Sequence, residues 1–303
     1  MCLDIDSAGT WWAGQWHRKN VSDTDMGEDC EFHRIKRLEI IKHFSGKKIW
    51  FSGDSLNRQL YMRTINYIRG MEGSMEHYFH DPALYTYYKN GTDKFEINVT
   101  MLPEMHKPLA DNELFRISFW FLLHVPADEI VSYKPDICII GAIHHFTWGS
   151  DWGNYTRQGV EDIVRNGSVT GYPKQFFWMM FADGDPGYPG NGPHLTNNAV
   201  QFASRARAQV VRVRPQVPNV NYQVIPFDTM SVDAPYKRNE LEKEWMGPNG
   251  LHFQCAFFPV YPQSILGFKT PPNNDCRDGF NLNMLFLVMN SIIRWEELHL
   301  ARL

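Results

Sequence analysis

Residues 48–59, KIWFSGDSLNRQ, are the stretch that decides the fold of this chain. The apolar run Lys48–Ser52 predicts a buried strand, and the Gly-Asp-Ser that follows predicts a tight turn. Apolar residues then recur at helical spacing from Leu60 until Gly70, so a helix is expected over residues 56–70. The stretch therefore predicts a strand–turn–helix unit.

The rest of the chain repeats this alternation of strands and helices. Short apolar runs are typical of parallel strands that are covered on both faces, and their alternation with helical patterns indicates an α/β protein. We predict a three-layer sandwich with a mostly parallel central sheet flanked by helices, in a single domain over residues 1–303 with residues 1–45 as an N-terminal arm packed on it. Strands are expected at residues 95–101, 114–124, 136–141, 175–182 and 222–227, and further helices at residues 35–43 and 197–211.

Composition excludes several classes of partner. The chain has 303 residues, 43% of them hydrophobic, which is enough for a large core. A net charge of -4 with scattered basic residues argues against a nucleic-acid surface. The longest apolar run, Ile117–Val125, is too short to span a bilayer, so no membrane contact is expected within this chain.

Glycosylation sequons indicate the compartment. No charged-then-apolar leader occurs at Met1, so the protein is either cytosolic or has lost its leader. Five Asn-x-Ser/Thr sequons occur, whereas about two are expected by chance. The excess favours the secretory pathway, either the Golgi lumen or the extracellular space. All sequons have polar or turn-like surroundings except Asn98, which is in a strand-like run; the others are Asn20, Asn90, Asn154 and Asn166.

The cysteines predict disulfides rather than a metal site. None has CxxC or His/Cys spacing, so no metal is expected. Cys138 lies in an apolar run and is interpreted as a buried free thiol. The remaining four cysteines allow two bridges in three pairings, of which the one with the shortest loops joins Cys2 to Cys30 and Cys255 to Cys276.

Ser55 is the first candidate functional residue. At a helix N-terminus, unpaired backbone N–H groups and the positive end of the helix dipole favour negative charge that develops beside a side chain. That position suits the nucleophile of an acyl-transfer reaction. The alternative is that Asp54 and Ser55 only cap the helix, since both residue types are preferred there.

Other candidate residues follow the ends of other predicted strands. In open α/β folds, ligands bind beyond the carboxyl ends of the strands. Gly141 ends one strand and is followed by His144 and His145, and Asp228 ends another, so these residues are expected at one edge with Ser55. Far along the chain, Gly247–Phe253 brings His252 after a turn-rich approach. A histidine beside Ser55 would remove its hydroxyl proton; the alternative for His252 is a structural role.

These motifs resemble the SGNH, or GDSL, hydrolase superfamily. Gly-Asp-Ser after the first strand and Gly-x-x-His late in the chain are its pattern. The string Gly53–Gln59 resembles the Gly-Asp-Ser-x-x-Arg signature of the PC-esterase branch, which includes trichome-birefringence-like proteins and the sialate O-acetyltransferase catalytic domain. Trp16 and Cys30 in the N-terminal arm are similar to that branch too, and His144 or His145 falls where it often carries Gly-His.

The resemblance implies a role for each site residue. Ser55 would be the nucleophile and His252 the general base, while the Ser55 backbone N–H and a donor at the Gly141 strand end would form the oxyanion hole. Arg58 would brace the loop or hold a substrate oxygen, and Asp54 would hold the turn. The resemblance also implies the sandwich fold predicted above.

One position departs from the family pattern. The family has Asp-x-x-His, whereas this chain has Asn249, which accepts a hydrogen bond from imidazole but cannot offset imidazolium charge. Another carboxylate (Asp228, Asp233 or Glu244) would orient His252, or the site would run as a Ser-His dyad, or it would be degenerate. Deamidation of Asn249 before Gly250 is a further route to aspartate.

The function expected from these residues is a serine esterase or O-acyltransferase that handles O-acyl groups, most plausibly acetyl, on glycans. No cofactor is expected, apart from an acyl donor such as acetyl-CoA or an acylated sugar in the transferase case. The first alternative is a glycan-binding domain that keeps the fold without the chemistry. A metal-dependent phosphate enzyme is weaker, because carboxylates near His144 and His145 lack ligand spacing.

Overall fold

The central sheet contains the apolar runs seen in the sequence. The computed structural model describes residues 6, 9–12, 15–18, 32–53, 55–68, 86–89, 93–99, 115–121, 125–141, 150–180, 193–232 and 280–300. Among these, seven strands form one sheet in the order β4-β5-β6-β3-β7-β8-β9. The strands are β3 (Lys48–Gly53), β4 (Thr86–Lys89), β5 (Asp93–Val99), β6 (Phe115–Phe121), β7 (Ile137–Gly141), β8 (Gln175–Met179) and β9 (Asn221–Ile225).

The sheet is mostly parallel, as predicted. From β6 through β3, β7 and β8 to β9, each neighbouring pair is parallel. At one edge of the sheet the pairing is antiparallel: β4 pairs with β5, and β5 pairs with β6. Every residue of β7, β8 and β9 is buried, which explains why β7 and most of β8 are apolar without alternation.

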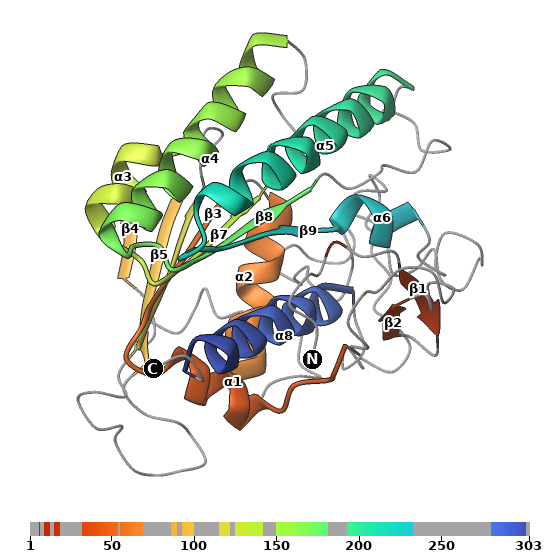
Figure 1. Cartoon of the computed structure of the whole chain (residues 1–303). Coiled ribbons are helices and arrows are strands. Elements are labelled where there is room, and N and C mark those ends of the chain that lie inside the picture. The colour runs from red at the N-terminus through yellow and green to blue at the C-terminus, as the bar shows by residue number, and fades with distance from the viewer. Residues whose placement is uncertain are drawn as a thin grey trace.

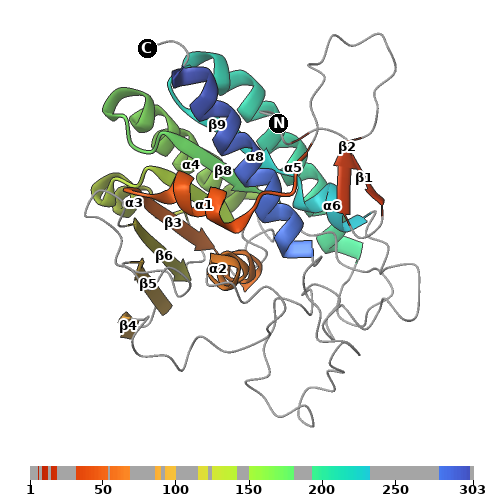
Figure 2. The ribbon, with the colours of Figure 1, turned by 90° about the horizontal axis from the view of Figure 1, so that it is seen from below.

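Helices cover both faces of the sheet. Figure 1 shows α3, α4 and α5 on one face and α1, α2 and α8 on the other, which confirms the three-layer α/β architecture. From below, in Figure 2, α1 and α2 lie next to each other beside α8, in agreement with the contacts among the three. The helices are α1 (Arg37–Phe44), α2 (Ser55–Ile68), α3 (Ala127–Tyr133), α4 (Ser150–Thr170), α5 (Pro193–Val213), α6 (Phe227–Val232) and α8 (Phe280–Leu300), with a 3₁₀ turn at Arg214–Gln216.

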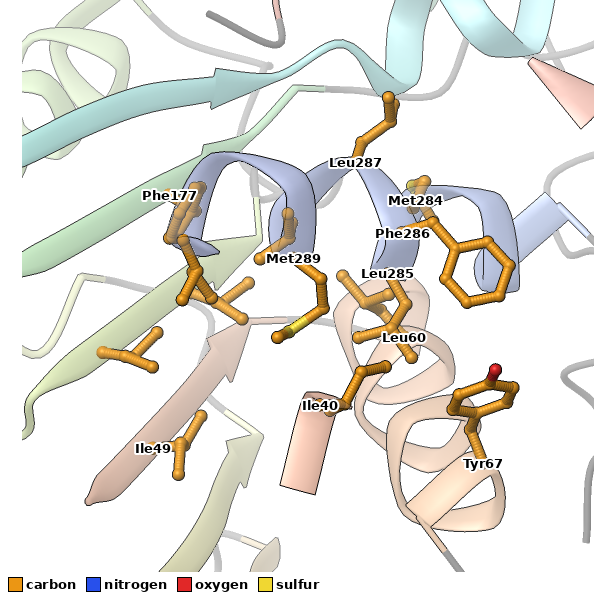
Figure 3. Packing of buried hydrophobic residues seen from close by; sticks show 14 of the residues in the cluster. Ile40, Ile49, Leu60, Tyr67, Phe177, Met284, Leu285, Phe286, Leu287 and Met289 are labelled. Carbon is orange, nitrogen blue, oxygen red and sulfur yellow. The ribbon is translucent and has the colours of Figure 1, made fainter. Parts of the chain in front are cut away.

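Two hydrophobic clusters hold the layers together. Alternate side chains of β3, β7 and β8 enter opposite clusters; in β3, Ile49 and Phe51 face α1, α2 and α8, whereas Trp50 faces α3 and α4. In Figure 3, Leu285 and Met289 of α8 lie among side chains of the sheet, α1 and α2. Because α8 is apolar on nearly all sides from residue 282 to residue 293, it forms the centre of this cluster.

Several elements differ from the sequence prediction. The helix expected at residues 197–211 is longer, and the strand expected at residues 222–227 stops at Ile225. Helices α3, α4 and α8, strand β4, and a hairpin of β1 (Gly9–Trp12) and β2 (Gln15–Arg18) within the N-terminal arm were not predicted. The division into one domain plus an arm stays a prediction.

Two sequons lie in a helix, not in turns. Polar or turn-like surroundings were predicted for Asn154 and Asn166; both are in α4, so they do not lie in turns. The Asn166 side-chain amide donates to the carbonyl oxygen of Tyr172 (3.2 Å).

Glycines in α4 hide its helical pattern in the sequence, because glycine is a poor helix former. Gly167 is required by packing, since a Cβ there would lie 2.5 Å from the Pro173 carbonyl oxygen.

A polar cluster closes the amino edge of the sheet. Glu296 of α8 accepts hydrogen bonds from Lys47, from His43 Nδ1 (2.7 Å) and from Gln175 Nε2 (3.1 Å). Burial alone would raise the pKa of Glu296, but the hydrogen bond from His43 and the charge of Lys47 outweigh it and lower the pKa. The native fold therefore holds this carboxylate ionised.

Protonation of Glu296 should weaken the fold in acid. Because its pKa is lowered by folding, its contribution is present above the ordinary value of 4.5 and is lost as the pH falls through the lowered value. Glu296→Gln should lower the free energy of unfolding at pH 7 by about 1–3 kcal/mol and flatten its decline below about pH 4.5. Urea unfolding at several pH values measures both effects. Glu297→Gln, at a more exposed neighbour, is the control, and equal pH profiles for the two variants would contradict the assignment.

Candidate active site at the carboxyl edge of the sheet

The turn between β3 and α2 requires glycine at its first position. Gly53 ends β3 with φ +146°, a conformation that other residues rarely adopt. Ser55 is then the first residue of the 14-residue helix α2. The predicted strand–turn–helix unit is therefore present, with Ser55 at the helix N-terminus. The Ser55 side chain and the whole of Asp54 lie outside the described residues.

The start of α2 has the electrostatic character expected of an anion site. The first N–H groups of a helix have no partner within it, and the helix dipole adds partial positive charge there. Its first turn contains no acidic residue. Negative charge that develops on an oxygen near Ser55 would therefore be stabilised. Arg58, within the same turn, is half-buried.

The end of β7 lies directly against this turn. A Cβ on Gly53 would lie 3.0 Å from Gly141 Cα, and one on Gly141 would lie 2.6 Å from Asn57 Cβ. The glycine at position 53 lets the two backbones approach closely, and the glycine at position 141 leaves room for the Asn57 side chain. The structure thus brings together Ser55 and Gly141, two of the predicted site residues, at the carboxyl edge of adjacent parallel strands. This is where open α/β sheets bind their ligands.

Asp228 lies past β9, in the first turn of α6, and is held by an arginine. Arg207 of α5 donates from Nη1 and Nη2 to the two carboxylate oxygens, at 2.6 and 2.9 Å. Arg207 also pairs with Asp6 (2.7 Å). Burial lowers the pKa of Arg207, but the hydrogen bonds to Asp228 and Asp6 outweigh it and raise the pKa. Both oxygens of Asp228 therefore already have a cationic partner.

The other residues predicted for the site lie outside the described residues. These are the proposed base His252 with Asn249, the histidines after β7 (His144 and His145), and the alternative carboxylate Asp233. The same holds for Glu244, for sequons Asn20 and Asn90, and for Cys2, Cys30, Cys255 and Cys276. Their roles stay predictions.

The described residues contain a free thiol but no metal cluster. Cys138 in β7 is a buried free cysteine, as predicted, and burial raises the pKa of its thiol well above the usual value. Within the described ranges, no group of three or more His, Cys, Asp or Glu side chains is placed to hold a metal ion. None of the helices in the described part of the chain has the length and apolar character needed to cross a bilayer.

The sequence analysis missed Asn57, which contacts both glycines of the site, and Arg207, which binds the predicted residue Asp228. Asn57 is fully buried and lies on the face of α2 that also carries Tyr61 and Thr64, so its helical spacing was a usable signal. Arg207 had no such signal, because its partners Asp228 and Asp6 lie in other elements, 21 and 201 positions away.

Comparison with known proteins does not assign a family. Neither a scan against protein-family models nor a search among curated proteins finds a match. The function is therefore argued from the residues of this chain and from its fold.

Proposed function

We propose that this protein is a serine-dependent carbohydrate O-acyl esterase or O-acyltransferase that acts on acetyl groups, with a site of the SGNH and PC-esterase type. The observation that carries the proposal is the position of Ser55. It is the first residue of α2, directly after β3, with the Gly141 end of β7 packed against the same turn. A hydroxyl there has backbone donors of the helix N-terminus beside it.

The reaction would have two halves. Ser55 Oγ attacks the ester carbonyl carbon while His252 takes the hydroxyl proton, and negative charge collects on the carbonyl oxygen. The Ser55 N–H and a donor at the Gly141 strand end stabilise that oxyanion. When the tetrahedral intermediate collapses, the alcohol leaves with the proton that His252 had taken, and the acyl group stays on Ser55 as an acyl-enzyme. Water or a sugar hydroxyl then attacks the acyl carbon, His252 again moves the proton, and Ser55 is released.

The proposed substrates are O-acylated glycans in the secretory pathway. The sequons and the pairable cysteines support a Golgi or extracellular location. The negative net charge argues against polyanionic partners. In the transferase case, the acyl donor would be acetyl-CoA or an acylated sugar, whereas the esterase needs no cofactor. Asp228, Asp233 or Glu244 would orient His252 in place of the aspartate that Asn249 replaces.

Covalent labelling tests the proposal directly. A fluorophosphonate probe should form a one-to-one adduct, and peptide mass spectrometry should place it on Ser55. The unmodified protein should also hydrolyse p-nitrophenyl acetate, and prior labelling should abolish that turnover. Heat-denatured protein is the control for unspecific hydrolysis. Absence of both the adduct and turnover would overturn the enzyme proposal.

Asn249 favours a second candidate, a glycan-binding domain that has lost its chemistry. An amide at this position cannot balance the charge of imidazolium. The retention of both Ser55 and His252 speaks for the enzyme. If labelling and turnover are both absent, saturable binding to a glycan array would identify the binding domain.

A further inference from the structure

Asn57 joins the two strands whose ends form the candidate site. Its side chain is fully buried. The amide Nδ2 donates one hydrogen bond to the Ser52 carbonyl oxygen of β3 (2.5 Å) and another to the Ile139 carbonyl oxygen of β7 (3.1 Å). A single amide group from α2 therefore connects the helix to both strands near their carboxyl ends.

Asn57 also fills the space between the two glycines. A Cβ on Gly53 would lie 3.1 Å from Asn57 Cβ, and one on Gly141 would lie 2.6 Å from it. The side chain thus sets how closely the turn and the end of β7 approach. The contacts of Asn57 with both glycines and its hydrogen bonds to both strands restrain the same distance, the one between the Gly53 turn and the end of β7.

This arrangement is not the one that stability alone would favour. The Asn57 Oδ1 atom is buried and has no hydrogen-bond partner among the described residues. A buried acceptor without a partner costs about 1–3 kcal/mol. A buried polar atom without a partner needs an explanation. One explanation is that its side chain is retained because it positions a functional site.

We propose that Asn57 is a positioning residue, which holds the backbone at Ser55 and the Gly141 end of β7 at the separation that the oxyanion hole requires. The role rests on the proposed function. Asn57 itself touches no reacting atom, since its donors are used by the Ser52 and Ile139 carbonyl oxygens. Its effect on the reaction passes through the backbone, where misplacement by about 1 Å costs about 100-fold in rate.

Two variants of Asn57 and one matched control separate positioning from stability. Asn57→Ala removes the packing and both hydrogen bonds, whereas Asn57→Asp keeps the shape but, when ionised, cannot donate. The control is Asn290→Ala, because Asn290 of α8 is also fully buried and its amide also donates to two carbonyl oxygens, those of His33 and Phe286. Thermal melting and the second-order rate of fluorophosphonate labelling are measured for each.

All three variants should melt below the wild type. Labelling should slow by about 10- to 100-fold in both Asn57 variants and stay within about twofold in Asn290→Ala. Equal labelling rates in the Asn57 variants and the wild type would overturn the positioning role while the proposed function stands. Slowing of Asn290→Ala to the same extent would also overturn it, because lost stability would then explain the effect.

Hydrogen exchange tests the restraint without any chemistry. Asn57→Ala should speed amide exchange in peptides that cover residues 49–56 and residues 137–141, whereas Asn290→Ala should leave both as in the wild type. Unchanged exchange in Asn57→Ala would overturn the restraint. If the wild type fails to label but Asn57→Ala shows this pattern, the proposed function fails and the restraint itself remains.

Discussion

Replacing His252 with alanine should lower the rate of p-nitrophenyl acetate hydrolysis by about 10²–10⁴-fold. The reason is that Ser55 keeps its proton near neutral pH and attacks an ester only as a neighbouring base removes it. Fluorophosphonate labelling of Ser55 should slow in parallel, since it uses the same activated oxygen. Initial rates, labelling time courses and a thermal melt of one preparation give all three quantities.

The melting temperature separates a lost base from a lost fold. It should stay close to that of the wild type, because the expected role of His252 is chemical. His33→Ala is the matched control: His33 is exposed, and its hydrogen bonds with Asn290 come from the backbone and not from the ring. An unchanged rate in His252→Ala would mean that another group acts as the base.

Replacing Gly141 with alanine should damage both stability and activity. The added Cβ would lie 2.6 Å from Asn57 Cβ, a distance that real Cβ atoms essentially never show, and Asn57 is fixed by its hydrogen bonds to two strands. Overpacking of this kind costs about 1–3 kcal/mol of unfolding free energy. The end of β7 must move away from the Ser55 turn, so labelling should slow more than the lost stability explains. Denaturant unfolding and labelling rates measure the two effects.

Gly159→Ala is the control for the general effect of an added methyl group. Gly159 is in α4, and a Cβ there would lie 3.3 Å from Val125 side-chain atoms, a tight contact with apolar neighbours. Alanine also favours a helix over glycine by about 1 kcal/mol, so this variant should unfold close to the wild type and label at an unchanged rate. A Gly141→Ala protein as stable and reactive as Gly159→Ala would refute the close packing of β3 and β7 at the site.

The layers of the fold were predictable where each segment had a distinct pattern. The strand expected at residues 136–141 has a short apolar run after Asp136, and this run forms β7, which is buried throughout. The C-terminal helix α8 was not predicted, because it is buried on nearly all sides and shows no polar face. Helix α4 was missed for the opposite reason, since glycine and asparagine interrupt its pattern.

The candidate site was predictable only in its local part. The turn at Gly53 and the start of α2 at Ser55 depend on neighbouring residues, so their sequence was enough to predict them. The contact of Asn57 with Ile139 joins residues 82 apart, and the pair of Arg207 with Asp6 joins residues 201 apart. The first pairing follows from the order of strands in the sheet and the second from the position of the N-terminal arm, and no local pattern contains either.

The position of α8 has a consequence for the order in which the molecule assembles. Asn290 bonds to the backbone of His33, 257 positions earlier, and Glu296 bonds to His43, 253 positions earlier. During synthesis, the apolar faces of α1 and α2 therefore lack the part of their packing that α8 supplies until α8 has left the ribosome. The α3, α4 and α5 side of the sheet draws on chain made before α8, so it can close first. We therefore expect the docking of α8 to be a late step in the folding of the described part of the chain.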